Sequence, residues 1–205
     1  MKIICQNRPP QRKGSSKQMK QIIFCTSCLT ILFILATGLK ADKNTPVLIT
    51  DLSSLPPLTH TMQQNLLKAS QQGDLEEIRD LFETNELTPV LGKDHVSNPI
   101  DYWKSQSIDG TARDTLANIA EVFSLPPVKT TEGDYVWPYL ARWPLDKLTP
   151  AQQIDLFRLA GPKQASEMLK NKKYSHFEAK IGKDGTWHSF ERITPAPSKQ
   201  EQTKK

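Results

Sequence analysis

Apolar and polar residues alternate along this chain with two different periods, and the change of period predicts its architecture. Apolar residues spaced three and four apart predict helices with one apolar face. The predicted helices are 61–72, a helix that begins at 75 and ends before a loop at 86, 99–107, 111–124, 149–160 and a shorter one at 163–170. Between Tyr174 and Ile193 the period becomes two, which predicts two strands joined by a loop at 183–185. The expected class is mainly α (α+β): five or six short helices with a C-terminal β-hairpin packed on the helical layer.

Local signals fix the expected ends of these helices. Gly73 and Gly161 are typical stop residues, and Asp74 is a typical N-cap with Glu77 at capping-box spacing. The pairs at 98–99 and 149–150 each place a capping residue before a proline at the first helical position. We therefore expect short helices separated by tight joints.

A lone hairpin is marginally stable, so a third strand is expected to support it. Val47-Leu48-Ile49 or Tyr135-Val136-Trp137 could supply that strand. The first lies in a proline-containing segment, 42–57, which we expect to be an extended strap. The globular domain is then 58–194, and the polar segment 195–205 is expected to be a disordered tail.

An N-terminal segment, 1–41, has the composition of a targeting sequence. Residues 22–39 are uncharged and mostly apolar, and basic residues precede them. That order is typical of a secretory signal, with cleavage after Gly38 or Ala41, although the run is nearly long enough for an uncleaved membrane anchor. Met1 and Met19 are both possible starts. We expect a periplasmic or extracytoplasmic protein, either secreted or held at the inner membrane by 22–39.

Charge is unevenly distributed between this leader and the rest of the chain. The formal net charge is +5, but residues 1–41 hold seven basic and no acidic groups. Residues 42–205 hold 20 basic and 22 acidic groups, a net of −2. A nearly neutral domain lacks the field that attracts phosphate backbones, so no nucleic-acid partner is expected.

All three cysteines, Cys5, Cys25 and Cys28, lie in the leader. The rest of the chain therefore has no disulfide, no thiol nucleophile and no thiolate metal site, in spite of an oxidising destination. We expect its stability to come from ordinary core packing and predict no cofactor.

Histidines offer two weak constellations. His176, Glu178 and His188 could face one another on the hairpin and bind zinc, but Lys180 and Arg192 interleave with them, and a solvated polar face is the simpler interpretation. His95 stands beside Asp94 with Asp101 nearby, which could form a general base. No nucleophile motif accompanies either set, so we predict no metal site and no catalytic residue.

The densest aromatic segment is 135–144, YVWPYLARWP. Exposed aromatic rings stack on sugars and arginine binds acidic groups, so this segment is the candidate ligand-binding or partner-binding site. The predicted site residues are Trp137, Tyr139, Arg142 and Trp143. Alternatively, aromatic residues between prolines fill the joint between packed layers.

The strings YVWPYLARWPLDKLTPAQQ and KIGKDGTWHSF resemble segments of a family of hypothetical exported proteins from alphaproteobacteria. The resemblance covers about residues 62–190. The family has no assigned activity, so the resemblance implies export and a single domain and transfers no catalytic residue.

Export without catalytic motifs leads to one main hypothesis and two alternatives. The main one is a non-catalytic cell-envelope module that binds another envelope protein or a cell-wall glycan. The first alternative is a glycan hydrolase with carboxylates near Trp137–Asp146, such as Glu132, Asp134 and Asp146. The second is a structural envelope protein held by an uncleaved anchor.

Overall fold

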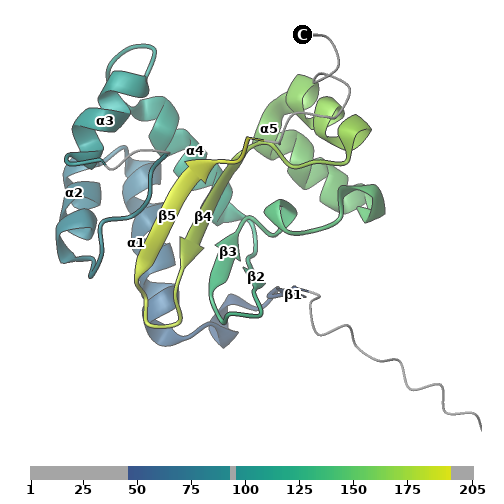
Figure 1. The fold of residues 1–205 in the computed structure, drawn as a ribbon, viewed down its shortest axis with the longest axis horizontal. Coiled ribbons are helices and arrows are strands. Elements are labelled where there is room, and N and C mark those ends of the chain that lie inside the picture. Colours follow the sequence, from purple (N-terminus) through teal and green to yellow (C-terminus); the bar gives the residue numbers. More distant parts are fainter. Residues whose placement is uncertain (1–45, 93–95, 195–205) are drawn as a thin grey trace, which may run out of the picture. The chain divides into compact units, whose positions relative to one another are not determined.

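The computed structural model describes residues 46–92 and 96–194. The helices in these residues are α1 (Pro57–Gln72), α2 (Leu75–Thr84), α3 (Pro99–Gln106), α4 (Arg113–Ser124) and α5 (Pro150–Asn171). The strands are β1 (Val47–Leu48), β2 (Val128–Lys129), β3 (Tyr135–Trp137), β4 (Phe177–Ile181) and β5 (Trp187–Arg192), and they form an antiparallel sheet in the order β1-β2-β3-β4-β5 (Figure 1). The predicted α+β class with a C-terminal hairpin is confirmed.

Both segments proposed as a third strand belong to the sheet. β3 pairs directly with β4, where Trp137 lies opposite Ala179, and Val47 and Leu48 form the far edge. The link between them is β2, which the sequence analysis did not identify. β2 has two residues and directly follows Pro126-Pro127, so it is too short to show a period of two.

Helices α1 and α4 cover one face of the sheet (Figure 1). The amide of Gln63 on α1 donates to the carbonyl of Phe123 on α4 at 3.1 Å, which joins the two helices. The hydroxyl of Thr59 on α1 donates to the carbonyl of Gly182 in the hairpin loop at 2.7 Å. Two buried polar side chains thus fix α1 against both its neighbours.

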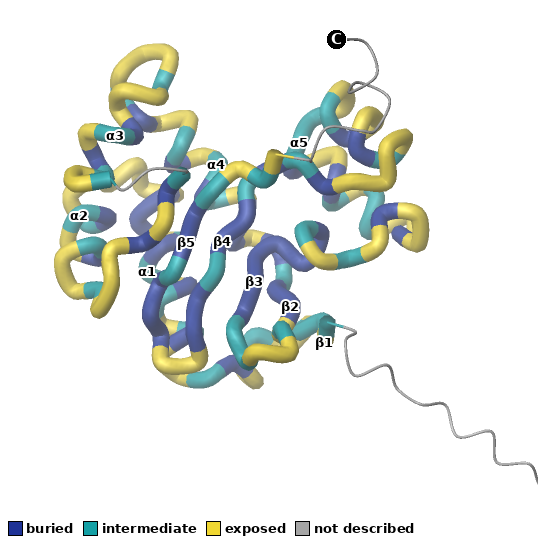
Figure 2. Tube along the Cα trace, in the orientation of Figure 1, coloured by how far each residue is buried: buried dark blue, intermediate teal, exposed yellow. Residues whose placement is uncertain are grey.

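Helices α2 and α3 pack beside β5 through aromatic rings. Phe82 of α2 stacks on Trp187 of β5 with 4.8 Å between ring centroids, and Trp103 of α3 meets Phe190 edge to face. Such contacts add to the hydrophobic gain of burying large rings. Buried residues accordingly follow β3, β4 and β5, and the outer turns of the helices are exposed (Figure 2).

Helix α1 begins four residues earlier than expected and takes Pro57, the last residue of the expected strap. Pro57 occupies the first helical position, where its missing N–H is not needed. The strap also contains a short 3-10 turn, Leu52–Ser54, which Asp51 caps. At the other end, Gly73 adopts a left-handed φ of 73°, as a C-terminal stop residue should.

Helix α5 bends sharply at Gly161, whose φ and ψ are 72° and 164°, and Pro162 follows. The expectation of two helices separated at Gly161 is therefore confirmed. The expected apolar face of the first half is only partly right. Leu156 and Leu159 are buried, but Ile154 is 61% and Phe157 37% exposed.

The hairpin loop follows the prediction in its conformation but not in its register. Gly185 has a φ of 87°, the left-handed position expected of it. The loop at 183–185 alone favours a diagonal pairing of Ile181 and Trp187, but a register shift at Lys180 and Ile181 places these two residues directly opposite each other. None of the helices in the described residues combines the length and hydropathy needed to cross a bilayer.

Candidate functional site

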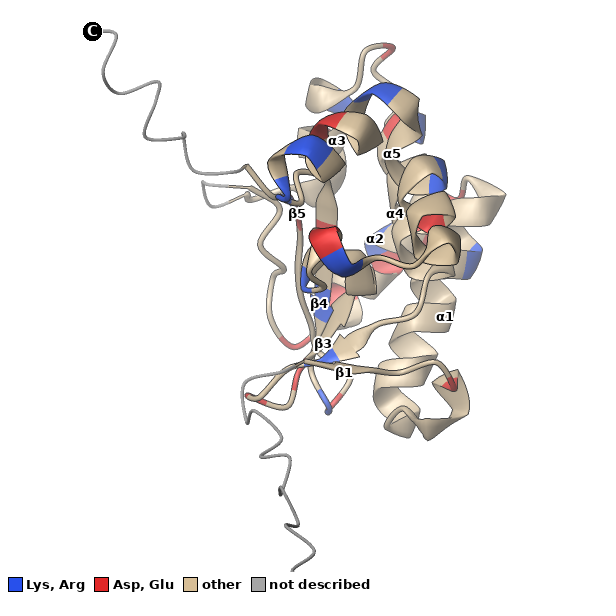
Figure 3. Cartoon of the chain, turned by 90° about the vertical axis from the view of Figure 1, so that its right-hand side faces the viewer, with Lys and Arg blue, Asp and Glu red and all other residues tan. Residues whose placement is uncertain are grey.

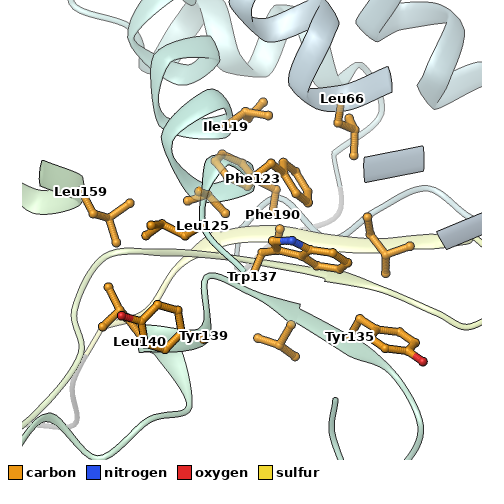
Figure 4. Close-up of a cluster of buried hydrophobic side chains, with 14 of the residues drawn as sticks. Leu66, Ile119, Phe123, Leu125, Tyr135, Trp137, Tyr139, Leu140, Leu159 and Phe190 are labelled. Carbon is orange, nitrogen blue, oxygen red and sulfur yellow. The ribbon is translucent and has the colours of Figure 1, made fainter. Parts of the chain in front are cut away.

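Two of the four predicted site residues are part of the core. Trp137 is fully buried and lies against Phe123 of α4, with ring centroids 5.5 Å apart (Figure 4). Tyr139 is 1% exposed. A buried ring has no face for an external ligand, so the contact role predicted for Trp137 and Tyr139 is corrected to the alternative, a joint between packed layers.

Tyr139 carries out that joining role through its hydroxyl. The hydroxyl donates to the carboxylate of Asp155 on α5 at 3.0 Å and so links the turn after β3 to the helix. Burial and the neighbouring carboxylate raise the pKa of Tyr139 above its ordinary value.

Arg142 and Trp143 are the predicted site residues that reach the surface. They follow the 3-10 turn Tyr139–Ala141, which carries the chain away from β3. Trp143 is half-buried and its ring meets Tyr139 edge to face at 6.3 Å. The side chain of Arg142 is 48% exposed. The core residue Tyr139 therefore supports a surface pair.

Arg142 is held by a carboxylate from the sheet. Its Nη2 donates to Oε1 of Glu178 on β4 at 2.6 Å, and the Glu178 side chain is 6% exposed. Burial raises the pKa of Glu178, and the charge of Arg142 opposes that rise. A buried carboxylate with an arginine partner is costly to separate, so the pair orients the guanidinium at the surface.

His176 is likewise buried, which corrects the expectation of a solvated hairpin face for both His176 and Glu178. Burial and the nearby charge of Arg192 lower the pKa of His176 to about 4, so its ring is neutral at physiological pH. Sequence periodicity missed this burial in part because Arg142, from a segment distant in sequence, contacts Glu178. Within the described residues, no three His, Cys, Asp or Glu side chains come together as a metal site.

Two clefts adjoin at Arg142. One, of about 400 Å³, is lined by Pro46, Thr130, Thr131, Glu132, Val136, Arg142 and Lys180. The other, of about 890 Å³, is lined by Pro46, Ala141, Arg142, Trp143, Pro144, Leu145, Asp146, Lys147, Lys172 and Tyr174. Because both share Pro46 and Arg142, we call them together the Arg142 double cleft. Their volumes lie in the range typical of small-ligand sites.

Cations outnumber anions along the Arg142 double cleft. Its basic residues are Arg142, Lys147, Lys172 and Lys180, and its acidic ones are Glu132 and Asp146. Elsewhere in the described residues, acidic and basic positions are interspersed (Figure 3). The lining itself therefore has a formal excess of two positive charges, and Glu178 and Asp134, which do not line the clefts, pair with Arg142 and Lys180.

Each cleft is lined by a single carboxylate among the described residues, Glu132 in the smaller and Asp146 in the larger. Asp134 lines neither, and it pairs with Lys180 at 2.7 Å. Glycoside hydrolysis needs two carboxyl groups facing one substrate. The double cleft as a whole thus offers two carboxylates, Glu132 and Asp146, one in each part.

The second histidine constellation cannot be assembled from the described residues. His95 and Asp94 lie outside them. Asp101 is described, and it serves the start of α3, where its backbone N–H and its carboxylate both contact Asn98.

Sequence reasoning found Arg142 and Trp143 but missed Lys147, Lys172, Lys180 and Pro46. These four residues come from four separate segments, and nothing local marks them as neighbours. The aromatic density around Trp143 was the one usable signal in this part of the chain.

Comparison with known proteins gives no assignment, because no family model, no curated protein and no solved structure matches the chain. The function therefore has to be argued from the site.

Proposed function

We propose that this protein is an exported, non-catalytic cell-envelope module that binds cell-wall glycan in the Arg142 double cleft. The observation that carries the proposal is that two clefts meet at Arg142, with Trp143 on the wall of the larger one. Sugar rings stack on exposed aromatic faces, and arginine donates to their polar groups in a fixed geometry.

A concave site favours a glycan over a folded protein partner. Clefts of a few hundred Å³ suit extended or small ligands, whereas protein partners generally need a broad contact surface. The pair formed by Arg142 and Glu178 further supports binding, because a ligand-contacting side chain that is already ordered loses less entropy when the ligand arrives.

The compartment is part of the same proposal. The leader-like composition of 1–41 supports work outside the cytoplasm, where a cell-wall ligand is available.

Co-sedimentation with purified peptidoglycan sacculi tests the proposal. The wild-type protein should pellet with the sacculi, and Trp143→Ala should bind about three- to tenfold more weakly, as expected for loss of one stacking ring. Phe157→Ala is the matched control, because it removes an exposed aromatic ring from α5 that does not line the double cleft.

Two results would contradict the proposal. Equal binding by wild type and Trp143→Ala would place the site elsewhere. Release of soluble sugar fragments during the incubation would identify an enzyme instead. Urea unfolding of each variant separates a loss of binding from a loss of folding.

A further inference from the structure

We propose that the ligand of the Arg142 double cleft is a carboxylate-bearing saccharide, with the carboxylate held by Lys147 and Lys172 and a sugar ring against Trp143. This inference rests on the proposed function and names its ligand class. Its basis is the distribution of charged side chains along the larger cleft.

The larger cleft is lined by three cations, Arg142, Lys147 and Lys172, and by one anion, Asp146. This lining has a formal charge of +2, whereas residues 42–205 as a whole carry −2. A positive cleft attracts anionic ligands. The charge contrast therefore selects an acidic ligand.

Not all these cations are equally available. Arg142 donates to Glu178 at 2.6 Å, which satisfies part of its charge. Lys172 lies 3.7 Å from Asp146, a longer and solvent-exposed pair that contributes little. Lys147 has no ion-pair partner among the described residues. Lys147 and Lys172 are thus the side chains that can take a ligand carboxylate.

Apolar residues occupy the same cleft beside these lysines. Trp143, Pro144 and Leu145 line it together with the buried ring of Tyr174. An inorganic anion would make no use of that surface. A saccharide with a carboxyl substituent matches both features, because its ring has apolar C–H faces and its acid group has a charge.

The probes for the test are trigalacturonic acid and its fully methyl-esterified form, titrated calorimetrically into the purified protein. The acid should bind, and the ester should bind at least about tenfold more weakly because it lacks charge. Affinity for the acid should fall between 0.05 and 0.5 M salt, since the Debye length shortens over roughly that range.

Variants locate the charge effect. The double variant Lys147→Gln and Lys172→Asn should bind the acid about three- to tenfold more weakly than wild type. Because it retains Trp143, it should still bind sacculi detectably. Asparagine is chosen at 172 because Lys172 has a left-handed φ of 54°, which asparagine tolerates. Lys104→Gln is the control, because this exposed lysine on α3 does not line the double cleft.

The outcomes separate the two proposals. Two results would overturn the proposal of an acidic ligand and leave the proposal of glycan binding intact. One is equal affinity of the wild-type protein for the acid and the ester, and the other is an unchanged affinity of the double lysine variant for the acid. Binding of sacculi without binding of either probe would also overturn it. Failure to bind sacculi and both probes would overturn the ligand class and the proposed function together.

Discussion

At the scale of single residues, Trp137 shows that a sequence can reveal a large apolar contact surface without revealing what that surface contacts. Its ring was predicted to contact a ligand, yet it is fully buried between the sheet and Phe123 of α4. Both roles use the same property, a large apolar area. Whether that area meets a ligand or a helix depends on which elements lie over β3, and single-residue composition does not contain that information.

Trp137→Ala should therefore act on stability. Removing a fully buried tryptophan costs about 3–5 kcal/mol, so the free energy of unfolding in urea should fall by that amount. Ile154→Ala is the control, since Ile154 is 61% exposed and surface substitutions usually change stability by less than about 0.5 kcal/mol. Similar values for the two variants would argue against the described core.

His176 gives a prediction about pH. Its pKa in the folded protein is about 4, below the ordinary 6.5, so the folded state binds fewer protons between these values. The stability contributed by the neutral ring is fully present above about pH 6.5 and is lost as the pH falls towards 4.

Urea unfolding of wild type and His176→Gln should reveal this loss. Between about pH 7.5 and pH 5, wild type should lose about 2 kcal/mol more than the variant. Glu178, whose raised pKa has the opposite effect, is present in both proteins and cancels from the difference. Parallel pH curves would show that His176 is protonated as easily in the folded protein as in the unfolded chain.

At the scale of elements, local signals predicted helices and turns well. Capping residues and glycines placed the ends of α2, α3 and the kink of α5 because their effects act within a few residues. The two-residue strands β1 and β2 were harder, since they depend on pairing between distant segments. The same reason explains the burial of Glu178, which period-two alternation alone assigned to solvent.

Gly185 tests the docking of the hairpin loop on α1. A Cβ there would lie 2.8 Å from the Cβ of Leu58, and the residue also has a φ of 87°. Gly110 has a φ of 70° with nothing within 4 Å of a Cβ. Gly110→Ala should thus cost about 1 kcal/mol from backbone strain, and Gly185→Ala about 1–3 kcal/mol more from overpacking. Thermal and urea unfolding measure both, and equal costs would mean that the loop is not docked on α1.

At the scale of the whole molecule, the double cleft shows what sequence could not assemble. Lys147 precedes α5, Lys172 ends it, Lys180 belongs to β4, and Pro46 stands before β1. Only the folded sheet and the turn after β3 bring these segments around Arg142. Arg142 and Trp143 were predictable because they happen to adjoin an aromatic run. Their lysine neighbours had no comparable local signal.

The leader provides the last prediction, because the charge argument for the cleft depends on which residues the working protein retains. If 1–41 is removed, seven basic groups leave with it and the rest carries a net of −2. N-terminal sequencing of protein recovered from producing cells should then begin at Leu39 or Asp42, in an extracytoplasmic fraction. A chain that starts at Met1 or Met19 and sediments with membranes would indicate the anchored form, with the same cleft facing the envelope. Intact chain dissolved in the cytoplasm would contradict export, and a cell-wall ligand would then be out of reach.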